Sequence, residues 1–279
     1  MKKNILFILL LFSSPLKIDA QYFSPHYVRM DKYKVLDSAY LKFTYKLTCI
    51  KDTLNPKKTT VTDMQVLLIG AKISKYFSQY VFDYNKRIQK LLQEGARSIP
   101  TNGDGFGYEV FKNYPPEKFT VTDLGTSVRG NYLYEEAIPD QNWKISMDSE
   151  TILSYTCQKA TTTFRGRDYT AWFTMGIPIG NGPWKFGGLP GIILKVSDLQ
   201  QNYIFECIGI ESLKKKEPIK LYQLDYTPID RKDLNKLYFR YHNNYVEFSK
   251  SFGVKVRTPD GRTLEHTETK IPYNPIELR

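Results

Sequence analysis

The side chains best suited to binding a charged group lie close together between residues 156 and 211. Arg165, Arg167 and Lys185 offer donors for a phosphate or a carboxylate. The same stretch offers apolar contact area from three aromatic side chains, Trp172, Trp184 and Phe186. This combination predicts a surface that recognises an acidic ligand or partner.

The same stretch also has a structural interpretation. Six Gly and three Pro occur between residues 176 and 191, so this segment cannot be a regular helix or strand. In this interpretation Trp184 and Phe186 plug the open end of a curved sheet, and the turn is shaped by Gly187 and the motif Gly188, Leu189, Pro190 and Gly191. The Pro-Gly pair suits a type II turn, with Gly191 at positive φ. Turn-forming residues favour this plug over a reactive centre.

Catalytic and metal-binding signatures are absent from the sequence. The three His, at positions 26, 242 and 266, are far apart, and none lies in a zinc-protease, serine-hydrolase or phosphate-loop motif. Gly103-Asp104-Gly105 and Asp198 are too sparse for a calcium loop. We therefore predict no catalytic residue, no metal ligand and no cofactor, although a triad assembled from distant residues stays an alternative.

Alternating apolar and polar residues predict many short strands. Aromatic residues make up 14% of the chain and include 21 Tyr, a composition that favours sheet. The predicted strands are residues 39–50, 62–69, 108–111, 118–124, 131–137, 143–147, 151–157, 168–174, 192–197 and 203–210. Residues 51–58 read as a turn, 76–84 as extended chain, and the basic run 214–216 as a loop.

Two segments have helical spacing. Residues 85–94 form the first, and Gly95 is placed to end it. Residues 230–252 form an amphipathic helix with an aromatic stripe, and Gly253 can cap it. Together these elements predict an α+β domain over residues 21–279, in which a large curved antiparallel sheet, half-barrel-like, packs against one or two helices. By fold-level analogy this resembles the open half-barrels of bacterial periplasmic lipoprotein carriers.

The first twenty residues have the pattern of a secretory signal. Lys2 and Lys3 precede an apolar run over residues 5–12, and Ala20 suits cleavage. The first cysteine is Cys49, far beyond the apolar run, so a lipid anchor at the new N-terminus is not expected. The net charge of +11 becomes +9 after cleavage, with 37 basic against 28 acidic residues. A positive surface favours acidic partners, but outside the cytoplasm nucleic acid is not expected among them.

The three cysteines lie in apolar, strand-like stretches. In an oxidising compartment Cys49, Cys157 and Cys207 would allow one disulfide and one free thiol, or all three could be small buried hydrophobes. No pairing is predicted.

Residues 176–191, rich in Gly and Pro, are called the Gly-Pro loop. The block around this loop resembles the GLPGLI family of exported Bacteroidetes proteins. The signature stands here as Gly188-Leu189-Pro190-Gly191-Ile192-Ile193, with Ile192 in place of the usual Leu. The N-terminal signature of the family is resembled by residues 68–70 and 74–77. The likeness is close over residues 156–198 and looser over most of the mature chain. It implies an exported protein of the periplasm or outer-membrane periphery, and no particular activity.

These observations predict a non-catalytic, exported binding or accessory protein. It would hold an amphiphile or a segment of a partner, or serve an outer-membrane transporter; its partners would be a lipid or amphiphile, or an outer-membrane protein. The alternatives are an exported hydrolase or peptidase whose site is not visible in the sequence, and a purely structural envelope protein. Oligomeric state is left open.

Overall fold

The computed structural model describes residues 30–96, 105–124, 128, 130–253, 255–256, 263 and 270–278. The predicted signal segment, His26, His266 and most of the Gly-rich loop at 101–107 lie outside these residues. The described strands are β1 (Tyr33–Ile50), β2 (Thr60–Gly70), β3 (Ser74–Ser78), β4 (Tyr108–Lys112), β5 (Lys118–Asp123), β6 (Tyr132–Ala137), β7 (Lys144–Ile152), β8 (Tyr155–Phe164), β9 (Arg167–Thr174), β10 (Ile192–Asp198), β11 (Tyr203–Tyr222) and β12 (Thr227–Pro228). The described helices are α1 (Pro56–Thr59), α2 (Gln79–Gln93), α3 (Arg231–Asn243) and α4 (Tyr245–Ser251).

All twelve described strands belong to one sheet, in the order β12-β6-β5-β4-β3-β2-β1-β11-β10-β9-β8-β7. Every pairing is antiparallel except that of the short β12 with β6. The large antiparallel-rich sheet with few helices is therefore as predicted. Short connections, such as those from β2 to β3 and from β4 to β5, allow only antiparallel pairing, because parallel pairing requires long crossovers.

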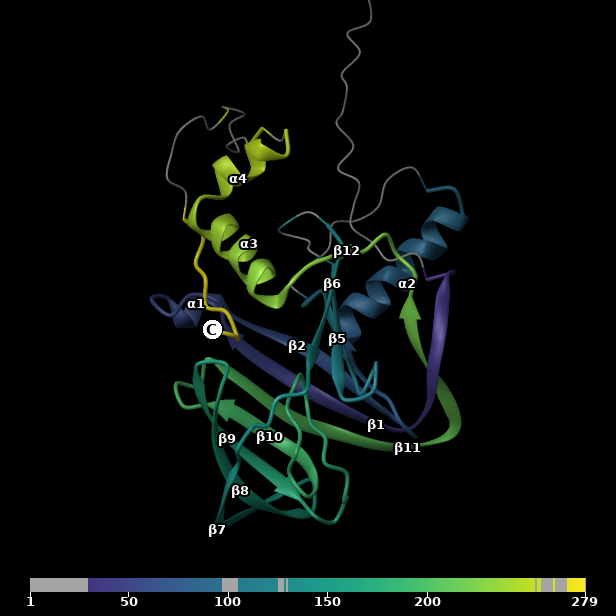
Figure 1. Ribbon diagram of the computed structural model, residues 1–279, viewed down its shortest axis with the longest axis vertical. Helices are drawn as coiled ribbons and strands as arrows, with labels where there is room; N and C mark the ends of the chain where they lie inside the picture. The colour runs from purple at the N-terminus through teal and green to yellow at the C-terminus, as the bar shows by residue number, and fades with distance from the viewer. Residues whose placement is uncertain are drawn as a thin grey trace, which may run out of the picture.

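The two longest strands bend the sheet over itself. The pairing of β1 with β11 shifts register at three points, and such irregularities let a strand bend. Figure 1 shows the resulting β1–β11 ribbon curving up one side of the molecule. The first half of β1 and the second half of β11 cover one face of β2, and on that face Val66 and Leu68 pack with Ile219. On the opposite face, Leu67 and Ile69 pack in the main core. The run 66–69 is thus buried on both faces.

Helix α2 begins six residues earlier than predicted. Ser78 ends β3 and caps the helix, because its Oγ accepts a hydrogen bond from the Val81 amide at 3.1 Å. The prediction of extended chain over residues 76–84 is therefore wrong from Gln79 onward. The helix ends as expected, with Gly95 at φ +82° after Gln93.

Two other connections differ from the prediction. The predicted strand over residues 151–157 is interrupted by a tight turn between β7 and β8. In this turn Leu153 and Ser154 adopt φ +47° and +68° between the paired residues Ile152 and Tyr155. Such turns usually carry Gly or Asn, so this one left no signal in the sequence. The basic run 214–216 lies within β11, not in a loop, and it is exposed beside the register break of β1.

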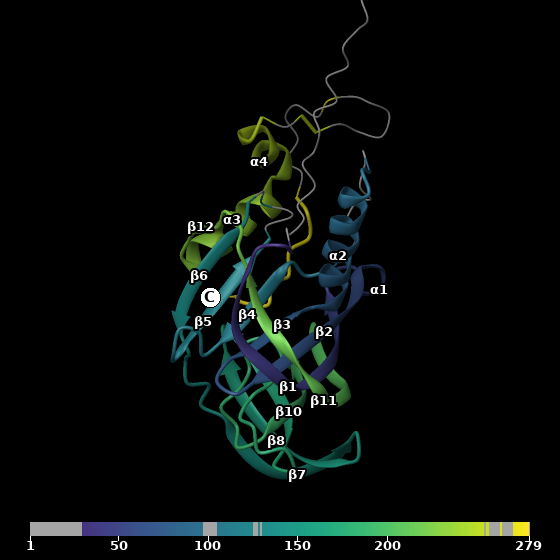
Figure 2. The same cartoon turned by 90° about the vertical axis from the view of Figure 1, so that its right-hand side faces the viewer.

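The predicted C-terminal helix over residues 230–252 is two helices. Asn244 ends α3 and starts α4, and its side chain accepts a hydrogen bond from the Glu247 amide at 3.3 Å. This capping interrupts the helix without changing which face is apolar. Leu234 and Phe248 still reach the main core. In Figure 1, β5 and β6 lie between α2 on the right and the α3–α4 pair on the left, and Figure 2 shows β6 and β12 beside α3. In the described residues, no helix has both the length and the apolar character needed to cross a membrane.

The Gly-Pro loop follows a different path from the predicted type II turn. The positive φ values fall at Trp184 (+45°) and Gly188 (+82°), and Gly191 has none. Gly191 is required for another reason, because its backbone packs directly on the carbonyl of Thr174 in β9. A Cβ at this position would lie 2.0 Å from that carbonyl oxygen.

Adding a methyl group at Gly191 is therefore expected to force two strands apart. Gly191→Ala should lower the free energy of unfolding by about 2–3 kcal/mol, the upper part of the range for overpacking. The matched control is Gly209→Ala in β11, where a Cβ would meet only the side chain of Thr44 on β1, no closer than 3.7 Å. That change should stay within about 0.5 kcal/mol. Urea unfolding measures both, and equal midpoints for the two variants would contradict the packing argument.

Candidate functional site

An open cleft of about 570 Å³ lies where the ends of two hairpins and the chain after β6 meet the Gly-Pro loop. The cleft is lined by residues 69–74, 112–113, 138–141, 179–181 and 185–188, together with Tyr40 and Phe119. These segments are the β2–β3 turn, the end of β4, the chain after β6, and the loop between β9 and β10. The cleft is thus built by connections, while the sheet holds those connections in place.

The two stretches that resemble GLPGLI signatures meet at this cleft. Asn181, in the loop, donates from Nδ2 to Ser74 Oγ at 2.8 Å across 107 residues of sequence. Gly70 and Ser74 line one wall, and Gly188 lines another. The structure therefore brings together motifs that the sequence places far apart.

Lys112 holds the loop against β4. Its side chain is buried, and Nζ donates to Asn181 Oδ1 at 2.8 Å and to the carbonyls of Gly182 at 2.7 Å and Phe186 at 2.6 Å. Loop carbonyls that no strand can satisfy thus receive hydrogen bonds from an ammonium group. Burial lowers the pKa of Lys112 well below its ordinary value.

Lys185, predicted to bind an anionic ligand, is bound by carboxylates of the chain itself. Its Nζ is buried and lies 2.9 Å from Tyr134 Oη, 2.7 Å from Glu136 Oε1 and 2.5 Å from Glu277 Oε1. Burial opposes the charged form, but Tyr134 and the two carboxylates outweigh it and raise the pKa of Lys185. These ion pairs hold the C-terminal segment, residues 270–278, against the Gly-Pro loop.

Two arginines complete this ion cluster. Arg165 Nη2 lies 2.6 Å from Glu136 Oε2, and Arg231 Nη1 of α3 lies 2.7 Å from Glu277 Oε2. Burial would raise the pKa of Glu277, but Lys185 and Arg231 lower it below its ordinary value. The cluster therefore joins the β8–β9 turn, the loop, α3 and the C-terminal segment.

Arg167 also binds the C-terminal segment. It is buried, with Nη1 3.0 Å from Asp198 Oδ2 and Nη2 2.6 Å from Asn274 Oδ1 and 2.5 Å from the Pro275 carbonyl. In the turn that places it, Gly166 adopts a positive φ of +86°.

Trp184 and Phe186, the two aromatic residues of the predicted plug, are buried in the main core. Phe186 is fully buried, with its ring centroid 4.8 Å from that of Tyr169 and 5.2 Å from that of Trp184. Trp184 is buried as well. Trp172 alternates to the other face of β9 and is half-buried.

Of the ten residues singled out in the sequence, Lys185, Phe186 and Gly188 line the cleft. Of the others, Arg165 belongs to the ion cluster, Trp184 packs on Phe186, and Gly191 packs on Thr174. Sequence reasoning missed Lys112 and Asn181. The predicted strand over residues 108–111 stops one residue before Lys112, and only the tertiary structure shows that Lys112 faces the loop.

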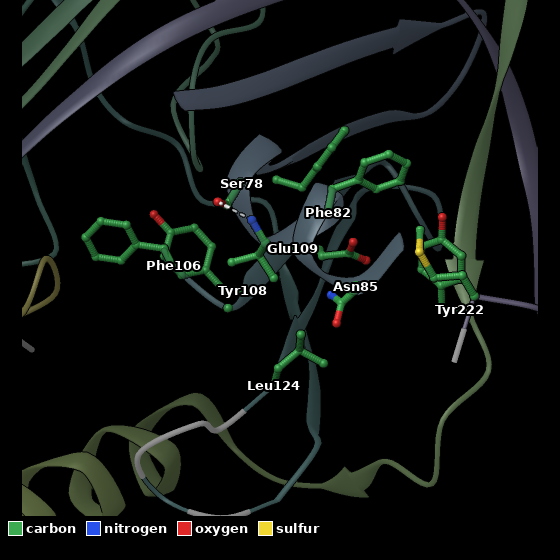
Figure 3. Close-up of a pocket in the computed structure, with 12 residues that line it drawn as sticks. Ser78, Phe82, Asn85, Phe106, Tyr108, Glu109, Leu124 and Tyr222 are labelled. Carbon is green, nitrogen blue, oxygen red and sulfur yellow. Dashed lines mark hydrogen bonds between the residues drawn. The ribbon is translucent and has the colours of Figure 1, made fainter. Parts of the chain in front are cut away.

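A second cavity lies between α2 and the sheet, and it is small. Its volume is about 20 Å³, room for about one water molecule. Figure 3 shows Ser78, Phe82, Asn85 and Tyr108 around it, with the Ser78 cap drawn as a dashed line. The space between this helix and the sheet is filled by side chains.

The remaining reactive groups are buried or stacked. His242 of α3 stacks on Tyr273 with ring centroids 4.3 Å apart, and burial lowers its pKa. Cys49, Cys157 and Cys207 are buried free thiols. Within the described part of the chain, no group of three or more His, Cys, Asp and Glu side chains is arranged to hold a metal ion.

Comparisons with known proteins give one family match. A family model described as "N-glycanase peptide, N-terminal domain" matches residues 112–236, less than half of the chain. None of the curated proteins matches. Two solved structures of PNGF-II, in the P21 and C2 space groups, are similar with TM-scores of 0.48 and 0.47. Both are 12% identical to this chain and are matched over 74% of it, and the chain spans 34% of their length.

The ion cluster predicts a specific dependence on Glu277. Glu277→Gln should lower the free energy of unfolding at neutral pH by about 3 kcal/mol, since it removes one carboxylate from buried cations. The matched control is Glu247→Gln, which removes an exposed carboxylate 3.0 Å from Lys250 and should cost less than about 0.5 kcal/mol.

The effect of Glu277 should depend on pH. Because folding lowers the pKa of Glu277, its stabilisation is present above the ordinary carboxyl pKa and is lost as pH falls through the folded-state value. The difference between the wild-type chain and Glu277→Gln in urea unfolding should therefore shrink under acid conditions. A difference that stays constant as the pH falls would exclude the ion cluster as its source.

Proposed function

We propose that this chain is a non-catalytic, exported binding protein whose cleft holds an amphiphile. The observation that carries the proposal is the cleft itself. Its volume of about 570 Å³ falls in the range of small-molecule sites, roughly 300–1,000 Å³. Its size and position support binding there rather than beneath α2, where the cavity has room for about one water molecule.

The walls of the cleft suit an apolar chain. Tyr40 and Ile138 are 39% and 42% exposed there, and Ile73, Pro139 and Ile179 add apolar surface. Large exposed apolar side chains gathered in a hollow are typical of a binding site. Burying them against a ligand would release the water that now covers them.

The walls are also preformed. Lys112 and Asn181 fix the loop to β4 and β3, so a ligand would not have to order it. Preorganisation of this kind lowers the entropic cost of binding. The curved sheet supports the half-barrel analogy with lipoprotein carriers, and the proposed location in the periplasm or outer-membrane periphery rests on the signal-like residues 1–20 and the GLPGLI resemblance.

A second candidate function is the exported hydrolase. The family model matched at residues 112–236 carries the name of an N-glycanase, and this favours an activity on N-linked glycans. Incubation with an N-linked glycopeptide, followed by mass spectrometry, tests it. Glycan release that survives rigorous purification would contradict the non-catalytic proposal.

Binding is tested with decyl amphiphiles that carry neutral, anionic or cationic head groups. Isothermal titration calorimetry should show saturable binding of at least one of them. Ile138→Asp should weaken it by about tenfold or more, because a wall isoleucine becomes a charge. Ile145→Asp is the matched control, an isoleucine 49% exposed on β7 outside the cleft, and should leave the affinity unchanged.

Two outcomes would overturn the amphiphile proposal. One is the absence of saturable binding for every head group. The other is equal loss of affinity in the two aspartate variants, which would place the ligand outside the cleft.

A further inference from the structure

Lys112 is a buried lysine with no carboxylate partner among the described residues. All three of its Nζ–H groups donate to neutral oxygens, namely one side-chain amide and two backbone carbonyls. Three donated hydrogen bonds match the three N–H groups of the ammonium form. Burial without a carboxylate partner disfavours that form and lowers the pKa of Lys112 well below its ordinary value. The side chain is only 7% exposed, and it lines the cleft.

The other buried cations in the described residues are all compensated. Lys75 Nζ lies 2.8 Å from Glu109, Arg167 Nη1 lies 3.0 Å from Asp198, and Lys185 has two carboxylates. Buried charges are normally paired because desolvation is costly. Lys112 is thus the exception, and it lies in the wall of the open cleft.

The surroundings of the cleft place positive charge and apolar surface side by side. Lys72 is exposed on the same wall, and its carbonyl accepts a hydrogen bond from Asn113, the residue next to Lys112. Asp140 is the acidic residue of the lining, and it is exposed at the rim with Oδ1 on the Asn142 amide. Tyr40 and Ile138 supply the exposed apolar surface.

We propose that the ligand of this cleft is a single-chain amphiphile with a carboxylate head group that acts as the counter-ion of Lys112. This inference rests on the proposed function and adds the charge of the ligand to it. All three N–H groups of Lys112 already donate to the protein, so Lys112 can attract an anion by its charge but has no free donor for it. A carboxylate, with a single charge, therefore suits this site better than a phosphate, which needs several hydrogen-bond donors. The acyl chain lies against Tyr40 and Ile138.

The test compares decanoate, decanol, decyl phosphate and decylammonium by calorimetry on the full chain. We expect decanoate to bind about tenfold or more tightly than decanol, and decylammonium to bind most weakly. Lys112→Met keeps the length of the side chain and removes its charge. It should bind decanoate and decanol equally, whereas the control Lys72→Met should keep most of the preference.

Lys112→Met removes three loop hydrogen bonds, so its fold is checked by circular dichroism. If it does not fold, nuclear magnetic resonance of the wild-type chain labelled at lysine ¹³Cε replaces it, with Lys112→Arg assigning the resonance. The Lys112 signal should then move with decanoate and not with decanol.

Each other outcome overturns a defined part of the argument. Equal binding of decanoate and decanol by the wild-type chain would sink the counter-ion inference and leave the proposed function standing. Tighter binding of decyl phosphate would overturn the carboxylate assignment, and loss of preference only in Lys72→Met would overturn the role of Lys112. Failure of all four amphiphiles to bind would overturn the proposed function itself.

Discussion

Two buried lysine side chains hold the Gly-Pro loop onto the sheet, and the shape of the cleft depends on them. A loop with six Gly and three Pro between residues 176 and 191 leaves many carbonyl groups without strand partners. Lys112 satisfies two of those carbonyls, and Lys185 anchors the loop to carboxylates on the opposite side. The two lysines solve different electrostatic problems, because Lys185 is charge-compensated and Lys112 is not.

Glycine contributes to the same structure through close approach. Gly191 lies against the Thr174 carbonyl, and a Cβ at Gly180 would lie 2.8 Å from the Leu189 carbonyl oxygen. These contacts let the loop fold back on β9 and present Phe186 to the aromatic core. The same loop therefore contributes to the core and to the cleft. Its aromatic side chains, Trp184 and Phe186, are buried, while Gly187 and Gly188 lie in the wall of the cleft.

The basic stretch that suggested recognition is used within the chain. Arg165, Arg167 and Lys185 bind Glu136, Asp198 and the C-terminal segment, as the chemistry of guanidinium and ammonium groups predicts. The residue types alone indicate that these side chains donate to oxygen acceptors. They do not identify the acceptors, because Glu277 lies 92 residues from Lys185 and no local pattern relates the two.

Local patterns determined the antiparallel strands, the end of α2 at Gly95 and the apolar face of residues 230–252, because alternation and turn chemistry act between near neighbours. They failed where a side chain overrode the pattern, as Ser78 and Asn244 did by capping helices, and where ordinary residues formed a tight turn, as at Leu153. The bend of the β1–β11 ribbon, the position of Lys112 and the cleft were decided by tertiary structure alone. Each depends on strands and loops far apart in the chain, and the burial of a charge or the fit of a glycine exists only once those segments are in contact.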